Sequence, residues 1–329
     1  AYFAKKVAMV ESDSHLGGAA AATTIPSKTL RETALALSGM KARRLHGVDL
    51  SLRRQATVQD LMYHESTVKE SERGRVEINM LRHNVDVLKG RASFVDKRTI
   101  KVKARSETPD FIEADVVLIA TGSSPRRPDN FPVWDHIYDS DSILSIKSIP
   151  EHMVGIGGGV IGCDYACLFR ALGVNVYLIN SRDTLLPVLD RNISSSLEKS
   201  MSNMGINLLM SEKVKACSIG SSGLVVELGA GQVLKTEAVL LATGRMSNTQ
   251  ELNLAAAGIT PGDHGLLIVD ENYQVIHPET RSTVPGIYAA GDVIGAPALA
   301  STSMEQARYA MIKAFQLDPY KQHLPPILP

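Results

Sequence analysis

Short apolar runs alternate with polar and turn-forming segments along this chain, and their lengths predict an α/β fold. Residues 152–156 form an apolar run that is typical of a short buried strand. Residues 163–172 then place apolar side chains at helical spacing, and Gly173 ends that pattern. Residues 174–179 follow as a second apolar run of strand length. A strand, a turn, a helix and a second strand in this order are typical of the βαβ unit of a parallel sheet.

The turn between the first strand and the helix has the spacing G-x-G-x-x-G. In this context Gly157 permits a tight turn, Gly159 lets backbone approach a pyrophosphate, and Gly162 lets the helix pack closely. The helix N-terminus adds free N–H groups and the positive end of the helix dipole. A glycine-rich turn without a ligand is the alternative, and the two flanking strands favour dinucleotide binding. We therefore expect a cofactor site at Gly157, Gly158, Gly159, Val160, Ile161 and Gly162.

Another pattern, a strand followed by a turn, occurs in two copies. Residues 115–122 are an apolar run that ends in A-T-G, and residues 238–244 nearly repeat it. The repeat predicts two related nucleotide-binding units. In the first unit, residues 7–10 form a strand that ends in Glu11, an acid suited to bind a ribose hydroxyl pair. A solvated carboxylate at the end of a strand is the alternative for Glu11.

The first unit carries no glycine fingerprint of its own. In the second unit Gly157 precedes Asn180, the residue at the end of the strand, by 23 positions, and the same spacing from Glu11 leads to position −12. We therefore expect the first fingerprint about a dozen residues before Ala1. On this interpretation residues 1–6 are the tail of its helix, and the chain is truncated at its N-terminus.

Other patterns predict the elements between and after these units. Pro26 favours the first turn of a helix that begins near Ile25, and Thr57 with Asp60 resembles a capping box for a second helix. We expect strands at residues 85–95, 99–104, 111–117, 266–270 and 286–292, and a helix at residues 301–314.

Composition limits the possible partners. The formal net charge is +0 and no long basic run occurs, which argues against binding to nucleic acid or to an anionic membrane surface. No apolar run approaches the ~18 residues of a membrane span. The three cysteines form no disulfide framework, and a reducing, cytoplasmic compartment is expected. We expect no metal site, and surface positions for His15, His64 and His323.

Taken in order, several motifs resemble the pyridine nucleotide-disulfide oxidoreductases, flavoprotein reductases with two dinucleotide-binding domains. The matching residues run almost from end to end: Glu11, 17–18, Ile25-Pro26-Ser27-Lys28, 120–122, 157–162, 242–245 and Gly291-Asp292. The resemblance implies an α/β fold with two Rossmann-like domains in three ββα layers, and FAD with NAD or NADP as cofactors. The predicted domains are an FAD-binding domain at 1–148, an NAD(P)-binding domain at 149–270, and a returning FAD-binding part at 271–329.

Departures from the family pattern indicate which branch of the family this chain resembles. Family members that act on dithiols carry C-x-x-x-x-C just before I-P-S-K, and here those two cysteine positions hold Ala19 and Thr24. Neither residue forms a thiolate, so a dithiol substrate is not expected. The segment from Thr24 to Arg31 resembles the transhydrogenase branch, although Ala19 is unusual there. The resemblance implies a Si-specific NAD(P) transhydrogenase that moves hydride between NAD(H) and NADP(H) through FAD.

The resemblance also implies roles for particular residues. Lys28 is expected near flavin N5 and Asp164 near the nicotinamide, and we hypothesise an ion pair between them as the catalytic feature. Asp292 is expected to bind the ribityl chain, and Glu11 the adenosine ribose of FAD. The remaining expected cofactor contacts are Ala92, Thr121, Gly122, Ser123, Val214, Gly244, Ala298, Leu299, Ala300 and Ser301. A solvated lysine and a first-turn acid that complements the helix dipole are the alternatives for Lys28 and Asp164.

Coenzyme choice depends on the end of the strand at residues 174–179. Asn180 stands where an acid would bind the 2′-hydroxyl of NAD and repel a 2′-phosphate. Arg182 is two residues on and suited to pair with that phosphate, and a plain surface arginine is the alternative. Use of both NAD and NADP is therefore expected.

Two other functions stay open at this stage. The chain ends where the C-terminal dimerisation domain of the family begins, so we expect that domain, and the homodimer interface it provides, to be missing. A degenerate nucleotide-binding protein without activity is one alternative. An NAD(P)H diaphorase or quinone reductase, which would use the same residues, is the other.

Overall fold

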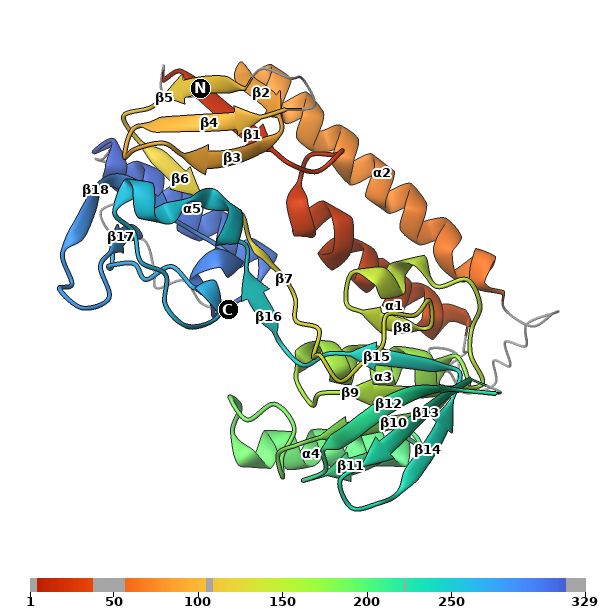
Figure 1. Ribbon diagram of the computed structural model, residues 1–329. Coiled ribbons are helices and arrows are strands. Elements are labelled where there is room, and N and C mark those ends of the chain that lie inside the picture. Colours follow the sequence, from red (N-terminus) through yellow and green to blue (C-terminus); the bar gives the residue numbers. More distant parts are fainter. Residues whose placement is uncertain (1–4, 38–56, 105–108, 222, 318–329) are drawn as a thin grey trace. The chain divides into compact units, whose positions relative to one another are not determined.

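The structure is a computed structural model that describes residues 5–37, 57–104, 109–221 and 223–317 (Figure 1). Contacts divide the chain into two compact units. Unit 1 comprises Ala1–Thr24, Glu70–Ser124 and Arg245–Pro329, and unit 2 comprises Ile25–Lys69 and Pro125–Gly244. The predicted functional domains at 1–148, 149–270 and 271–329 stay a prediction, because a division by contacts does not say what each part binds.

Unit 2 is built on a five-stranded parallel sheet. Its strand order is β11 (Asn207–Met210), β10 (Asn175–Asn180), β9 (His152–Ile156), β15 (Ala238–Leu241) and β8 (Ile137–Asp139). Each neighbouring pair of strands is parallel. The strands that were expected around the glycine turn, at 152–156 and 174–179, are β9 and β10. They pair in register, with Val176 opposite Met153.

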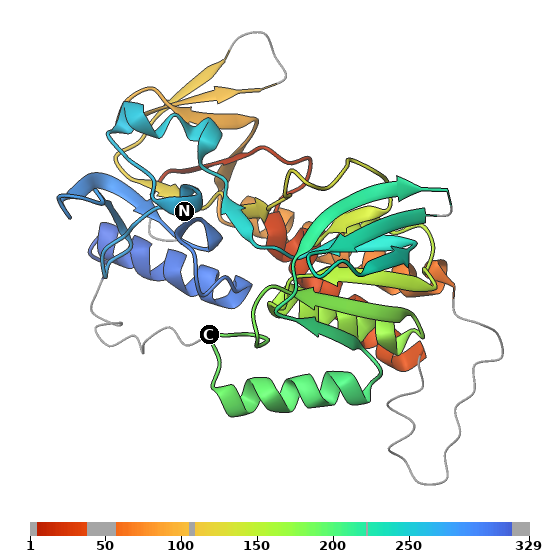
Figure 2. The same cartoon turned by 60° about the horizontal axis from the view of Figure 1, so that its bottom comes forward.

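Two different layers cover the faces of this parallel sheet (Figures 1 and 2). Val176, Leu178 and Leu240 pack in one core with helix residues such as Phe169 and Leu30. The helices on that face include α1 (Ile25–Leu37), α3 (Val160–Ala171) and α4 (Arg191–Asn203). Alternate strand residues pack in another core against the antiparallel sheet β12 (Val214–Gly220), β13 (Gly223–Leu228) and β14 (Val233–Thr236). Unit 2 therefore has the three ββα layers that were expected.

Helix boundaries in unit 2 follow local signals in the sequence. Thr57 precedes α2 (Val58–Arg82), and its N–H donates to Asp60 Oδ2 at 2.8 Å while the Asp60 N–H donates to Thr57 Oγ1 at 3.3 Å. This reciprocal pair is the predicted capping box. Helix α3 begins three residues earlier than expected, at Val160, and it stops before Gly173, whose φ of 91° favours glycine.

Unit 1 contains several small sheets and one long helix at its C-terminal end. Strands β1 (Val7–Glu11) and β2 (Val85–Lys89) form a parallel pair. Strand β18 (Thr283–Ala289) lies between β17 (Gln274–Ile276), which is antiparallel to it, and β6 (Val117–Ile119), which is parallel. Helix α5 (Ala300–Ala314) packs beside β18 (Figure 2). The remaining sheets are β3 (Arg91–Phe94), β4 (Thr99–Lys103) and β5 (Asp110–Glu113), and the pair β7 (Ser123–Pro125) and β16 (Arg245–Ser247).

The short helices lie in turns and connections. They are the π-helix η1 (Ala20–Thr24) and the 3₁₀-helices η3 (Ser142–Ser145), η4 (Gln250–Leu252), η5 (Leu254–Ala257), η6 (Asp263–Gly265) and η7 (Asp292–Ile294). No helix in the described ranges is both long enough and apolar enough to cross a lipid bilayer.

Four predictions about elements in unit 1 were wrong. The strand expected at 111–117 is instead two strands, β5 and β6, which belong to different sheets. The strand expected at 85–95 breaks at Gly90, where a Cβ would lie 2.7 Å from the carbonyl oxygen of Lys103, and the chain changes from pairing with β1 to pairing with β4. Residues 266–270 form only one isolated bridge, between Val269 and Val275, because their apolar side chains pack in the core without a partner strand. Lys5 and Lys6 are not helical, and Ala1–Ala4 lie outside the described residues.

Candidate functional site

The glycine turn of unit 2 has the close contacts that its spacing predicts. Gly157 has a φ of 114°, and a Cβ there would lie 2.2 Å from the carbonyl oxygen of Ala242. A Cβ on Gly162 would lie 1.9 Å from the carbonyl oxygen of Gly157, so the helix packs directly on the turn. Gly159 is the N-cap of α3, and a Cβ there would meet nothing within 4 Å. Open space therefore lies beside backbone N–H groups that begin a 12-residue helix, which suits a phosphate.

Asn180 and Arg182 occupy different surroundings at the end of β10. The side chain of Asn180 is 6% exposed and hydrogen-bonds to backbone groups of Gly158, Arg182 and Thr184. Arg182 is exposed. The amide at 180 is thus occupied within the fold, whereas the guanidinium at 182 is presented at the surface.

Asp164 and two basic residues form a charged cluster in unit 2. Asp164 lies on α3, in its second turn, so the reading of Asp164 as a first-turn acid was wrong. Its partner in an ion pair is Arg31 of α1, with 3.6 Å between Arg31 Nε and Asp164 Oδ1. Burial raises the pKa of the Asp164 carboxyl, and the charges of Arg31 and Lys28 oppose that rise.

The hypothesis of an ion pair between Lys28 and Asp164 was wrong, because the ion-pair partner of Asp164 is Arg31. Arg31, one helical turn beyond Lys28, makes the contact, and Lys28 acts on Asp164 only through its charge. Arg31 is the residue that the sequence reasoning missed here. Its spacing of three from Lys28 on a helix was the available signal, because residues three apart share one face. The expected place of Lys28 near flavin N5 stays a prediction.

All three cysteines are free, and all lie in unit 2. Cys163 and Cys167 are one turn apart on α3, and Cys217 is on β12. Burial raises the pKa of the Cys163 thiol to about 12, with smaller contributions from Cys167, Asp164 and Glu198. Burial also raises the pKa values of Cys167 and Cys217. Thiols of this kind are poor nucleophiles at neutral pH.

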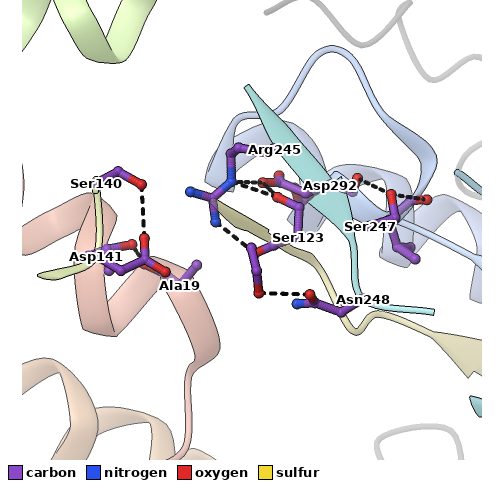
Figure 3. A network of polar contacts seen from close by, with 12 residues as sticks. Ala19, Ser123, Ser140, Asp141, Arg245, Ser247, Asn248 and Asp292 are labelled. Atoms are coloured by element: carbon purple, nitrogen blue, oxygen red, sulfur yellow. Dashed lines mark hydrogen bonds and ion pairs between the residues drawn. The ribbon is translucent and has the colours of Figure 1, made fainter. Parts of the chain in front are cut away.

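In unit 1 a polar network surrounds Asp292, the first residue of η7, which follows β18 (Figure 3). Ser123 Oγ donates to Asp292 Oδ2 at 2.8 Å. Arg245 donates from Nε to Ser123 Oγ at 2.7 Å and from Nη2 to the carbonyl oxygen of Ser123 at 2.6 Å. Arg245 Nε also lies 3.9 Å from Asp292 Oδ2. The two strands β7 and β16 therefore hold one half-buried carboxylate in a fixed orientation.

Neighbouring backbone belongs to the same network. Asn248 Nδ2 donates to the carbonyl oxygen of Thr121 at 2.9 Å, and the Asn248 N–H donates to that of Gly122 at 3.0 Å. Gly122 has a φ of 68°, and a Cβ there would meet nothing within 4 Å. The network thus brings together the predicted residues Thr121, Gly122, Ser123 and Asp292. It adds Arg245 and Asn248, and Arg245 was signalled only as the residue after the second A-T-G motif.

Other expected cofactor residues lie in ordinary positions in the fold. Glu11 ends β1, and its Oε1 accepts the N–H of Asp13 at 3.0 Å. Ala92 is in β3, and Val214 begins β12. Leu299 is the N-cap of α5, so residues 298–301 lead into the N–H groups of its first turn. Gly244 has a φ of 115° and open space at its Cβ position. Their contacts with cofactors stay predictions.

Two of the three histidines that were expected at the surface can be checked in the structure. His15 and His64 are exposed as expected, and His323 lies outside the described residues.

One group of possible metal ligands was not expected. It consists of Glu151, His152 and Glu237, whose ligand atoms lie within 4.8 Å of one another on exposed side chains. Sequence reasoning missed this group because β9 and the turn before β15 are far apart in the chain. Exposed acidic groups gather in this way without a metal ion, and we assign no metal site.

Comparison with known proteins identifies relatives over nearly the whole chain. Residues 1–307 match the family model described as pyridine nucleotide-disulphide oxidoreductase. A soluble pyridine nucleotide transhydrogenase from Mycobacterium bovis is 39% identical over 315 residues, which are 94% of this chain and 66% of the relative. A soluble pyridine nucleotide transhydrogenase from Colwellia psychrerythraea is 38% identical over 309 residues, or 93% of this chain and 64% of the relative. The chain thus spans about two thirds of the length of these relatives.

Solved structures agree with these matches. A crystal structure of LpdA from Mycobacterium tuberculosis superposes with a TM-score of 0.85 at 27% identity, covering 94% of this chain and 67% of that one. The fold of the flavoprotein disulfide reductase RclA from Escherichia coli is also similar, with a TM-score of 0.81 at 24% identity over 95% of this chain and 66% of that one. Members of the matched family use FAD and NAD(P). With its glycine turn, its Asp292 network and a family match over residues 1–307, the chain belongs to the pyridine nucleotide-disulphide oxidoreductase family.

Proposed function

We propose that this protein exchanges hydride between NAD(H) and NADP(H) through FAD, without a redox-active disulfide. The observation that carries the proposal is the identity of residues 19 and 24. Ala19 and Thr24 stand where dithiol members of the family carry cysteines, before the Ile25-Pro26-Ser27-Lys28 motif. The name of the transhydrogenase relatives supports the same reaction.

The residues of unit 1 fit FAD. Gly122 leaves open space beside its backbone, and Asp292 presents a half-buried carboxylate whose orientation Ser123 and Arg245 hold. A carboxylate fixed in this way is suited to accept hydrogen bonds from sugar-alcohol hydroxyls. We assign Asp292 to the ribityl chain, Thr121 and Gly122 to backbone contact, and Glu11 to the adenosine ribose. When bound, FAD supplies the hydride acceptor and donor that no side chain of this protein provides.

The residues of unit 2 fit a nicotinamide dinucleotide. Open space at Gly159 and the N–H groups at the start of α3 suit the pyrophosphate. Asp164 lies on the same helix, one turn further on, and its ion-pair partner Arg31 lies on α1. We assign Asp164 to hold the nicotinamide end of the coenzyme and Lys28 to supply positive charge to the reaction, with the charge of Arg31 opposing the rise in the Asp164 pKa that burial causes. Arg182 is assigned to the 2′-phosphate of NADP.

A coupled assay tests this proposal. The 329-residue chain, incubated with FAD and freed of excess, is given NADPH and thio-NAD⁺, and reduced thio-NAD is followed by its absorbance. The proposal predicts FAD-dependent turnover, and no reduction of lipoamide or glutathione disulfide in parallel assays. Reduction of a disulfide at a comparable rate would contradict the absence of dithiol chemistry. NADPH oxidation by a quinone without thio-NAD⁺ reduction would identify a diaphorase instead.

A further inference from the structure

The side chain of Asn180 hydrogen-bonds to backbone groups within the fold. The side-chain oxygen Oδ1 accepts the N–H of Gly158 at 3.2 Å. The amide nitrogen Nδ2 donates to the carbonyl oxygens of Arg182, at 3.2 Å, and Thr184, at 2.8 Å. Both N–H bonds of a primary amide are used by these two acceptors. At 6% exposure, Asn180 has no donor left for a ribose hydroxyl unless it breaks one of these bonds.

Gly158 is the matching part of this contact. Its carbonyl oxygen accepts the N–H of Leu186 at 3.0 Å, so Gly158 is bound to the 181–186 loop through its carbonyl group and to Asn180 through its N–H. A Cβ at Gly158 would lie 2.7 Å from Asn180 Cγ and 2.7 Å from Leu185 Cδ2. Gly158 therefore leaves the room that the Asn180 side chain occupies, and Asn180 hydrogen-bonds both to the phosphate-binding turn and to the loop at residues 181–186.

A carboxylate at position 180 is incompatible with this arrangement. Aspartate accepts hydrogen bonds but donates none when ionised, so its oxygens would face the carbonyl oxygens of Arg182 and Thr184. The usual selection rule, in which an acid at the end of the strand binds the 2′-hydroxyl, needs a side chain that points to the ligand. Here the side chain points into the fold. The backbone of Arg182 is also fixed, since its carbonyl oxygen accepts the Ser211 N–H at 3.0 Å, while its side chain is exposed.

The geometry points to Asn180 as a positioning residue that ties the glycine turn to the 181–186 loop and does not itself select the coenzyme, which leaves that selection to Arg182, already assigned to the 2′-phosphate. Neutral asparagine is present for the architecture of the turn rather than for tolerance of a phosphate. This inference rests on the proposed binding of NAD(P) at the α3 turn, and it assigns the preference at that site to one residue instead of two.

The test compares Asn180→Asp, Asn180→Ser and Arg182→Ala with the unchanged chain. Asn175→Asp, at the exposed start of the same strand, is the matched control for the added charge. Hydrogen exchange of amides 181–186 is measured without ligand, and calorimetry gives the affinities for 2′,5′-ADP and 5′-ADP. Both Asn180 variants are expected to raise exchange over 181–186 and to weaken both nucleotides by about tenfold, leaving their ratio unchanged. Arg182→Ala is expected to leave exchange unchanged and to weaken only 2′,5′-ADP, again about tenfold.

The outcomes distinguish the positioning role of Asn180 from the binding of NAD(P) at the α3 turn. Normal protection over 181–186 in Asn180→Ser overturns the positioning role, even if Asn180→Asp fails to fold. An Asn180→Asp chain that keeps its protection and shifts its preference to 5′-ADP overturns it as well. If the unchanged chain binds neither nucleotide, the proposed NAD(P) site fails, while the exchange data still decide whether Asn180 holds the loop.

Discussion

Gly157 and Gly159 of the α3 turn differ in the space around them: backbone crowds the Cβ position of Gly157, and the Cβ position of Gly159 is open. Gly157→Ala places a Cβ 2.2 Å from the Ala242 carbonyl oxygen at a φ of 114°, whereas Gly159→Ala points into open space. We expect Gly157→Ala to lower the free energy of unfolding by about 2–4 kcal/mol and Gly159→Ala to change it by less than about 0.5 kcal/mol. Because Gly159 borders the proposed pyrophosphate position, its alanine variant should instead weaken NADP binding.

Urea unfolding and calorimetry with NADP check this pair of glycines. Each variant is the control for the other, because both add one methyl group to the same turn. Equal losses of stability would contradict the different roles of the two positions.

The Arg31–Asp164 pair predicts a dependence of stability on pH. Burial raises the pKa of Asp164 above its ordinary value of 3.8, so the native state holds the proton more tightly than the unfolded chain does. The contribution of Asp164 to stability is therefore complete below pH 3.8 and is lost as pH rises through the raised pKa. Arg31→Met removes an opposing charge, so the pKa should rise further and the loss should extend to higher pH. Asp164→Asn should abolish this component.

Urea unfolding of these variants from acidic to neutral pH measures the effect. Arg191→Met is the control, because Arg191 makes an ion pair of similar type with Asp183 at 3.9 Å, between well exposed side chains. Identical pH profiles for the unchanged chain and Arg31→Met would rule out an effect of Arg31 on Asp164.

At the scale of elements, the capping box sets the start of the 25-residue helix α2. Thr57→Ala removes the Oγ1 acceptor of the Asp60 N–H, and we expect a loss of about 1 kcal/mol in the free energy of unfolding. Thr67→Ala is the matched control inside the same helix, where Thr67 Oγ1 donates to the Tyr63 carbonyl oxygen and caps nothing. A loss at Thr67 as large as that at Thr57 would show that the cap is not the cause.

The pair of strands β7 and β16 predicts how FAD is retained. Ser123→Ala removes the hydrogen bond to Asp292 and one of the acceptors of Arg245. We expect the dissociation constant for FAD to rise about tenfold, measured by flavin fluorescence on titration. Ser124→Ala is the neighbouring control, because Ser124 Oγ donates to Asn248 rather than to Asp292. Unchanged FAD affinity in Ser123→Ala would remove the Asp292 network from the proposed flavin site.

At the scale of the whole molecule, local signals predicted what depends on nearby residues. The turn at 157–162, its flanking strands β9 and β10, and the box of Thr57 and Asp60 all depend on residues close in sequence, and all are present. Helix α4 was missed although Asp190 caps it, accepting the Asn192 N–H, and Ile193 and Leu197 follow at helical spacing. The strands β12 and β13 were also missed, although apolar and polar residues alternate along β13.

Contacts between segments that are far apart in the chain could not be predicted from a single sequence. Arg31 meets Asp164 because α1 packs on α3, and Arg245 meets Ser123 because β16 lies beside β7. The role of Asn180 required its side-chain direction, since the same residue at the end of a strand can point to a ligand or into the fold. Residue types therefore indicated the kind of site, and tertiary packing decided which of those residues are occupied elsewhere.

In the proposed reaction, hydride passes from one nicotinamide to another through bound flavin. The most direct test is an anaerobic titration of the FAD-loaded chain, followed by its visible spectrum. We expect NADPH to bleach the flavin bands, and NAD⁺, added after NADPH is exhausted, to restore them with formation of an equal amount of NADH. Flavin that NADPH reduces but NAD⁺ cannot reoxidise, or a chain that takes up no FAD, would contradict the proposed reaction.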